Sequence, residues 1–133
     1  MKSIKISIPS LIENITIIES FIDNAREKFN INDDIYGNIM ISVTECVSNA
    51  IIHGNNENAK KIVKLELIFM GNQLKFVIED EGEGFDYQSL TDPTSPENLE
   101  KPGGRGVFIM RHLSDEVDFQ ENGRRAILTF YMN

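Results

Sequence analysis

Cysteine is almost absent from this chain, which has 133 residues and one cysteine, Cys46. A single cysteine excludes an intrachain disulfide and fits a reducing, cytoplasmic location. Cys46 lies inside an expected helix, and the sequence places neither histidine as its partner. Because buried cysteines usually behave as small apolar residues, we expect Cys46 to pack in the core rather than act as a nucleophile.

Long apolar runs are also missing. The chain begins with alternating polar and apolar residues, whereas a signal peptide has a continuous apolar block. No run approaches the length that a membrane-spanning helix needs, so we expect no membrane partner. With 41% hydrophobic and 26% charged residues, the composition is typical of a soluble globular protein. We expect a single domain with its own core over residues 1–133.

Basic residues are scarce relative to acidic ones. The 13 Lys and Arg residues are outnumbered by 21 Asp and Glu residues, and the formal net charge is −8. A general nucleic-acid surface needs clustered basic residues, so direct nucleic-acid binding is not expected. A single nucleotide is a different case, because backbone N–H groups, a magnesium ion and one or two cations can hold it.

The pattern of apolar residues predicts both strands and helices. Period-two alternation and short apolar runs predict strands at residues 2–9, 61–70, 73–79, 116–120 and 125–132. Gly71-Asn72 and Asn122-Gly123 predict the turns of two hairpins. Helical spacing predicts helices at residues 10–29, 34–53 and 107–113. Ser10 and Glu13 form a capping-box pattern for the first helix, and Asp33 is the expected cap of the second.

These elements follow the order strand, helix, helix, two strands, loop, helix, two strands. Strands joined by short turns must be antiparallel, so the sheet is expected to be mixed and mostly antiparallel. Three helices are too few to cover both faces of a sheet. We therefore predict an α+β fold, a two-layer α/β sandwich with the helices on one face. The loop over residues 86–103 is long, and such loops are usually functional or disordered.

The end of the second helix carries a row of polar side chains. Glu45, Asn49 and His53 are four residues apart, which places a carboxylate, a carboxamide and an imidazole along one stripe. Gly54 is expected to stop the helix in a left-handed conformation. On this helix alone, the solvent side of an amphipathic helix is the simpler interpretation of the row.

A first glycine-containing segment favours a site. Asp80-Glu81-Gly82-Glu83-Gly84 directly follows an expected strand. The Asp80 carboxylate can accept a hydrogen bond from an exocyclic amine such as that of adenine. Gly82 and Gly84 let the backbone pass close to a flat ring. An acidic turn is the alternative, and this segment alone does not exclude it.

A second glycine-containing segment, Gly103-Gly104-Arg105-Gly106-Val107, precedes the third helix. Its glycines free backbone N–H groups to face an anion, and Arg105 adds a positive charge. A glycine-rich hinge before a helix is the alternative. The spacing is neither that of a Walker loop nor that of a dinucleotide-binding fold.

Taken together, the segments allow phosphoryl transfer. With a triphosphate at the second glycine segment, Asn49 can offer its carbonyl oxygen to Mg²⁺. Glu45, one turn earlier, can accept a proton from an attacking hydroxyl or water. Arg105 and Mg²⁺ would offset the charge at the transferring phosphoryl group.

The three segments, in this order, resemble the motifs of the GHKL ATPases, the superfamily of gyrase, histidine kinases and MutL. Glu45-x-x-x-Asn49-Ala50-x-x-His53-Gly54 is similar to the N-box, and Asp80-x-Gly82-x-Gly84-Phe85 to the first glycine box. Gly104-Arg105-Gly106-Val107-Phe108-Ile109-Met110-Arg111 is similar to the second glycine box. The similarity covers nearly the whole chain. It is greatest to small stand-alone members, the anti-sigma-factor serine/threonine kinases of the RsbW and SpoIIAB type. Residues 92–103 of this chain resemble the lid of those kinases.

The resemblance implies a Bergerat-fold ATP site that uses ATP and Mg²⁺. Glu45 matches the catalytic base, Asn49 the magnesium ligand and Asp80 the adenine contact. The other positions that match nucleotide-binding residues are Gly82, Gly84, Gly104, Arg105, Gly106, Val107 and Phe108. Arg105 is also a candidate for catalysis. The role of His53 stays open between two alternatives. One is a place near the phosphates, and the other is that of a cation that ends the helix favourably. His112 is expected at the surface.

The resemblance also implies a function and partners. Proteins of this type phosphorylate a serine or threonine of a small STAS-type anti-sigma-factor antagonist, and many hold a sigma factor inactive, usually as homodimers. One alternative is a non-catalytic ATP-binding regulator that sequesters a sigma factor or another partner. A free histidine-kinase catalytic domain is disfavoured, because the chain lacks room for a dimerisation helix pair. Relatives often have Gly-Thr where this chain has Gly123-Arg124, so the threonine contact to the adenine site is not carried over, and Thr129 is too distant to replace it.

Overall fold

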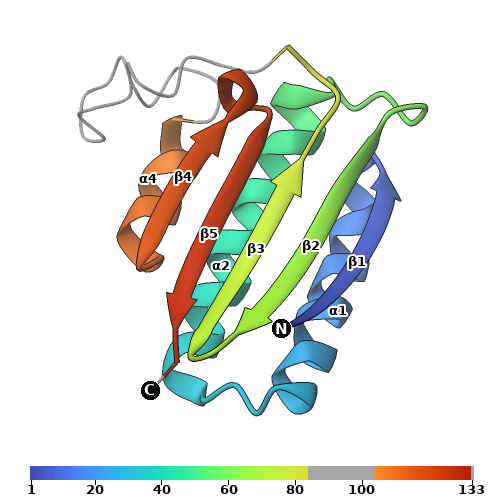
Figure 1. Ribbon diagram of the computed structural model, residues 1–133. Helices are drawn as coiled ribbons and strands as arrows, with labels where there is room; N and C mark the ends of the chain where they lie inside the picture. The colour runs from blue at the N-terminus through green and yellow to red at the C-terminus, as the bar shows by residue number, and fades with distance from the viewer. Residues whose placement is uncertain (84–103, 133) are drawn as a thin grey trace.

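The computed structural model describes residues 1–83 and 104–132. One layer is a sheet of strands β1 (Lys2–Pro9), β2 (Ile62–Met70), β3 (Gln73–Glu79), β4 (Glu116–Gln120) and β5 (Arg125–Tyr131). The other layer holds the helices α1 (Ile15–Lys28), α2 (Asp33–Asn49) and α4 (Gly104–Leu113). Short helical turns lie at Ile12–Asn14 (η1), Ala50–Gly54 (η2) and Glu121–Gly123 (η4). Figure 1 shows all three helices behind the sheet, so the predicted two-layer α+β sandwich is confirmed.

The strand order across the sheet is β1-β2-β3-β5-β4. All four pairings are antiparallel, so the described sheet is wholly antiparallel rather than mixed. The predicted hairpin between β2 and β3 is confirmed, and Gly71 adopts a φ of +61° in its turn, which glycine does without steric cost. Glu79, the last residue of β3, pairs with Arg125, the first residue of β5. The segments that follow β3 and precede β5 therefore lie side by side at one end of the sheet.

The helix α2 is the centre of the helical layer. Ile39, Val43 and Val47 recur every four residues and are all 0% exposed, so one stripe of the helix is entirely in the core. The strands meet this stripe with alternating buried side chains, which include Val63, Leu65, Leu67, Leu74, Phe76, Ile78, Ala126, Leu128 and Phe130. α2 packs between α1 and α4 and against β3 and β5. This packing holds the C-terminal end of α2 near the point where β3 ends (Figure 1).

The same helix corrects the expectation about membrane-spanning length. Within the described residues, Asp33–Gly54 is the one helical segment that is long and apolar enough to cross a membrane by length and composition, with 22 residues and a mean hydropathy of 1.3. Its apolar stripe is instead the one that packs against the sheet. Core helices of compact domains can have this composition, because a helix apolar on most sides is a buried helix.

Both predicted helix caps were wrong. The Ser10 hydroxyl donates to the Lys61 carbonyl at 2.7 Å and caps no helix, and the first helical segment begins later, at Ile12. At the second helix, the cap is Asn32, whose side-chain oxygen accepts from the Ile35 N–H at 3.1 Å. Asp33 is instead the first residue of α2, where its negative charge suits the helix N-terminus.

Candidate functional site

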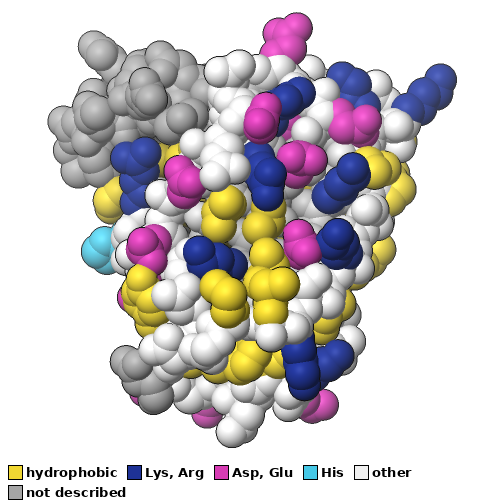
Figure 2. Space-filling model, viewed as in Figure 1, with side chains coloured by type: hydrophobic (Ala, Val, Ile, Leu, Met, Phe, Trp, Pro, Cys, Tyr) yellow, Lys and Arg dark blue, Asp and Glu magenta, His cyan; other side chains and the backbone are white. Residues whose placement is uncertain are grey.

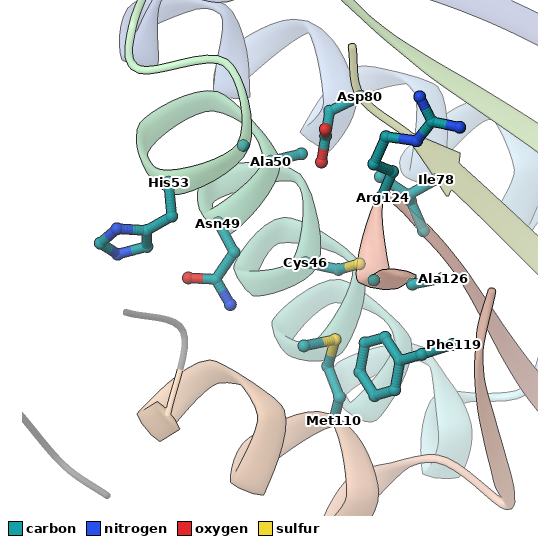
Figure 3. A pocket seen from close by; sticks show the side chains of 12 residues that line it. Cys46, Asn49, Ala50, His53, Ile78, Asp80, Met110, Phe119, Arg124 and Ala126 are labelled. Carbon is teal, nitrogen blue, oxygen red and sulfur yellow. The ribbon is translucent and has the colours of Figure 1, made fainter. Parts of the chain in front are cut away.

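A pocket opens between the end of α2, the end of β3, the start of β5 and the helix α4 (Figure 3). Its floor is apolar and comes from Cys46, Ala50, Ile78, Met110, Phe119 and Ala126. Its polar lining comes from Asn49, His53, Asp80 and Arg124. An apolar pocket with a few convergent polar groups is typical of a small-molecule site. All three sequence motifs contribute residues to the lining of this pocket or to the segments that contact it.

Asn49 and Gly106 come together where α2 faces α4. Asn49 is the last residue of α2 and is half-buried, and its side-chain Nδ2 is buried with no hydrogen-bond partner among the described residues. A Cβ placed on Gly106 would lie 2.1 Å from that Nδ2, so only glycine fits there without displacing the carboxamide. In Figure 3, Nδ2 points towards α4, and Oδ1 points towards the side of the pocket where His53 lies. Nδ2 is thus the amide atom that is enclosed beside α4, and Oδ1 points away from that helix.

Asp80 and Gly54 are in equally close contact. The helical backbone continues beyond Asn49 as a π-helical turn, η2, in which the Asn55 N–H donates to the Ala50 carbonyl at 2.8 Å. A Cβ on Gly54 would lie 2.3 Å from Asp80 Oδ2. The predicted left-handed stop at Gly54 was wrong, because Gly54 is not among the described glycines with positive φ. Its missing side chain makes room for Asp80 instead.

Gly82 completes this contact from the other side. Its N–H donates to Asp80 Oδ1 at 2.7 Å, and a Cβ on Gly82 would lie 2.0 Å from the Gly54 carbonyl oxygen. The turn after β3 and the end of η2 therefore meet backbone to backbone. Such an approach is possible only because both residues lack a side chain.

The Asp80 carboxyl is perturbed by its surroundings. Burial raises the pKa of this carboxyl above its ordinary value, and the charge of Glu79 adds to the rise. The Gly82 N–H bond and the charges of Arg124 and Lys61 act in the opposite direction without cancelling it. A partly buried carboxylate of this kind gains most from a ligand that donates a hydrogen bond to it.

Arg124 stands where the sequence departs from the GHKL pattern. Its carbonyl accepts from the Asp80 N–H at 3.0 Å, and its guanidinium pairs with Glu121 at 3.2 Å. The preceding residues Glu121, Asn122 and Gly123 all have positive φ, which confirms the predicted turn at Asn122-Gly123. Arg124 is therefore a pocket residue that sequence reasoning left without a role. Thr129 is buried in β5 opposite Lys75, away from Asp80.

Of the other predicted site residues, Glu45, Val107 and Phe108 are not in the pocket lining, whereas His53 is. Glu45 is half-buried on α2, one turn before Asn49, and its side chain makes no hydrogen bond or ion pair with the described residues. Val107 is a core residue at 1% exposure, whereas Phe108 is 41% exposed and its ring stacks on His112 at a centroid distance of 5.8 Å. The expected surface position of His112 is confirmed. His53 is exposed at the pocket rim.

The two glycine segments are described only in part. α4 begins at Gly104, three residues earlier than predicted, so the backbone of Gly104, Arg105 and Gly106 forms its first turn. The first N–H groups of a helix have no partner within it and are ready to face an anion. Gly84, the predicted lid and the side chain of Arg105 lie outside the described residues.

Cys46 is a core residue of the protein and not a nucleophile. It is buried at 5% exposure, as predicted, and forms part of the pocket floor. Burial raises the pKa of its thiol to about 12, so the thiolate needed for nucleophilic attack does not form near neutral pH. Its contribution to the site is apolar surface.

The chain was compared with known proteins. The family model of the histidine kinase-like ATPase domain matches residues 8–132. The chain is 28% identical over 137 aligned positions to the serine-protein kinase RsbW of Staphylococcus aureus strain JH9, and the alignment covers 97% of this chain and 86% of that protein. The proteins of the same name from strains Newman and USA300 give the same values.

The glycine contacts predict a size limit at Gly106. The Gly106→Ala variant should weaken ATP binding at least tenfold, because the new methyl group would displace the Asn49 carboxamide. Gly37→Ala is the matched control, since nothing lies within 4 Å of a Cβ at this exposed position of α2. It should keep wild-type affinity and gain about 0.5–1 kcal/mol of stability from helix propensity. Calorimetric titration with ATP checks both, and equal affinity of the two variants would contradict the prediction.

The raised pKa of Asp80 predicts opposite effects on stability and binding. Because the fold disfavours the ionised carboxyl, Asp80 contributes stability at acid pH that is lost as the pH rises through its folded pKa. At pH 7, Asp80→Asn should therefore unfold at the same or a higher temperature than the wild type while losing most of its ATP affinity. Glu83→Gln, at an exposed position of the same turn, makes the same charge change and should alter neither. Thermal unfolding and calorimetry measure the two effects. A clear fall in the melting temperature of Asp80→Asn would show the sign to be wrong.

Proposed function

The chain belongs to the histidine kinase-like ATPase family of the GHKL superfamily, and on this premise we propose that it is an ATP-dependent protein serine/threonine kinase. We further propose that it acts in a bacterial partner-switching module and phosphorylates a STAS-type anti-sigma-factor antagonist. The observation that carries the proposal is that Asn49, Gly54 and Asp80 line one pocket, while Gly82 and Gly106 lie directly against these lining residues. The name of the relatives, serine-protein kinase, supports the choice of acceptor residue.

The end of the pocket at Asp80 suits the base of the nucleotide. Asp80 supplies a carboxylate acceptor for an exocyclic amine, and the glycine contact of Gly54 and Gly82 holds that carboxylate in place. Ile78, Met110 and Phe119 supply the apolar surface against which a flat ring can pack. The ionised form of Asp80 is the form that accepts two hydrogen bonds, so base binding would offset the cost of its burial.

The end of the pocket at Asn49 suits the phosphates. The first turn of α4, with Gly104, Arg105 and Gly106, would present its free N–H groups to them. No cluster of three or more His, Cys, Asp or Glu side chains that could hold a metal exists in the described part of the chain. A Mg²⁺ ion fits nonetheless, because it commonly keeps waters and takes its remaining ligands from one or two side chains and the substrate phosphates. Asn49 Oδ1, which points away from α4, would be that side-chain ligand, and the ion would offset the charge of the phosphoryl group.

Glu45 is the residue we assign to proton acceptance. It lies one helical turn before Asn49, and this position supports a role for its carboxylate near the phosphates rather than near the base. It is free of ion pairs and hydrogen bonds with the described residues, which leaves its oxygens available to a serine or threonine hydroxyl of the acceptor. Arg105 would stabilise the charge that develops on the transferred group.

The partners and the assembly are parts of the same proposal. The negative net charge of −8 suits a partner with basic residues, such as a sigma factor held by the same protein. We propose that the chain is one domain, works in the cytoplasm and assembles as a homodimer.

A second candidate function is a regulator that binds ATP without transferring its phosphate. The observation that favours it is the absence of Glu45 from the pocket lining. The two candidates differ in one product. After incubation with ATP, a captured antagonist carries phosphate on serine or threonine if the kinase proposal is right, and carries none if ATP only controls partner binding.

The kinase proposal predicts a split between chemistry and binding at Glu45. Glu45→Gln keeps the shape of the side chain but removes the base, so phosphate transfer to a co-purified antagonist should fall roughly 10²- to 10⁴-fold. ATP affinity should stay within about twofold of the wild type, because Glu45 does not line the pocket. Glu27→Gln, at an exposed position of α1, is the control and should keep full transfer. Mass spectrometry of the antagonist measures transfer, and wild-type transfer by Glu45→Gln would remove Glu45 from this role.

A further inference from the structure

Asn55 is a buried polar residue that no motif includes. It is 0% exposed and directly follows Gly54 at the end of η2. Its Nδ2 donates to Ser10 Oγ at 2.8 Å and to the Ile62 carbonyl at 3.0 Å. Its Oδ1 accepts from the Glu81 N–H at 2.8 Å. Both donors and the acceptor of the carboxamide are thus used, which fixes the orientation of the side chain.

These bonds join segments that are distant in the sequence. Ser10 follows β1, Ile62 begins β2 and Glu81 follows β3 by two residues. The network closes on itself, because the Glu81 carboxylate accepts from the Ile62 N–H at 2.5 Å and the Ser10 hydroxyl donates to the Lys61 carbonyl at 2.7 Å. Ser10 and Asn55 are the buried members of this network, whereas Glu81 is exposed. Displacement of the buried carboxamide would leave unpaired polar groups, which keeps this part of the network rigid.

The network adjoins the contact that forms the base end of the pocket. Asn55 is the residue after Gly54, and Glu81 lies between Asp80 and Gly82. The bond from the Glu81 N–H to Asn55 Oδ1 therefore spans the two segments at the place where Gly54 meets Asp80 and Gly82. The glycines permit this approach but do not enforce it. Asn55 supplies the side-chain hydrogen bond that holds the segments together.

We propose that Asn55 is a positioning residue for the nucleotide site, which sets the place of Asp80 relative to the end of the helix without touching the ligand. The inference rests on the proposed function in one respect, that the ligand is a nucleotide whose base meets Asp80. Loosening this contact lowers affinity for the nucleotide. It leaves phosphate transfer at saturating ATP nearly unchanged, because Asn49 and Glu45 lie earlier in the chain, on α2, and not at the bond between Asn55 and Glu81.

Ser10 separates positioning from plain stability. Ser10 is also 0% exposed and also bonds to Asn55, but its bonds go to the Lys61 carbonyl and to Asn55 Nδ2, and neither reaches the turn after β3 that carries Asp80. Ser10→Ala leaves the bond between Asn55 Oδ1 and the Glu81 N–H in place. A role of the network in folding alone would make Ser10→Ala and Asn55→Ala equivalent in ATP affinity.

The experiment compares ATP affinity, melting temperature and the KM and kcat for ATP in the wild type, Ser10→Ala, Asn55→Ala and Asn55→Asp. We expect Ser10→Ala to melt at a lower temperature but to bind ATP within about twofold of the wild type. Asn55→Ala should bind about tenfold more weakly, which corresponds to about 1.4 kcal/mol, with a raised KM and a kcat within about twofold. Asn55→Asp keeps an acceptor for the Glu81 N–H and should therefore bind ATP more tightly than Asn55→Ala. Its melting temperature should be no higher than that of Asn55→Ala.

The outcomes distinguish this inference from the proposed function. Wild-type affinity in Asn55→Ala, or an equal loss in Ser10→Ala, would overturn the positioning role and leave the kinase proposal intact. If Asn55→Ala does not fold, Asn55→Asp decides, and a loss of affinity there equal to or greater than tenfold overturns the inference. A wild-type protein that binds no ATP would overturn the proposed function and this inference together.

Discussion

The contact between the end of the central helix and the turn after β3 determines the geometry of the pocket. Gly54 and Gly82 meet there backbone to backbone, and the Asp80 carboxylate occupies the space that a side chain on Gly54 would fill. Because the carboxylate is partly removed from water, its charge is unfavourable in the fold until a donor reaches it. The Asp80 carboxylate is therefore unfavourable for the stability of the empty protein but favourable for the binding of a ligand that donates a hydrogen bond to it. Such a cost at a binding site is a common exchange of stability for function.

The core makes this contact possible. Ile39, Val43, Val47 and Ile51 hold α2 and η2 against the sheet with no exposed surface. The π-helical turn η2 widens the end of the helix and directs Gly54 towards Asp80, and such turns are frequent at functional sites. On the opposite side of α2, α4 brings the Gly106 backbone against Asn49. One central helix thus positions both ends of the pocket (Figure 3). The outer face of the sheet in Figure 2 carries charges of both signs around apolar side chains that gather along its middle.

The sequence predicted those features that depend on local pattern. Alternation predicted β1, the Gly71-Asn72 pair predicted the hairpin, and helical spacing predicted α2 with its buried stripe. The motifs predicted one site with Asn49, Asp80, Gly82 and Gly106. Asn49 and Asp80 line one pocket, Gly82 contacts Asp80 and Gly106 contacts Asn49, although their roles with a ligand stay predictions. The failures concern contacts between distant segments. The Ser10 hydroxyl bonds to Lys61 instead of capping a helix. No local pattern indicates a role for Asn55, because its three partners come from three other segments.

The central claim is that this pocket holds ATP with Mg²⁺ through Asn49. Calorimetric titration of the wild type and of Asn49→Ala with ATP, each with and without Mg²⁺, tests it most directly. We expect the wild type to bind ATP more tightly with magnesium than without it. We expect Asn49→Ala to lose most of this gain while keeping its fold, since the residue is only half-buried. A wild type that binds no ATP, or an Asn49→Ala variant with the full magnesium effect, would contradict the account.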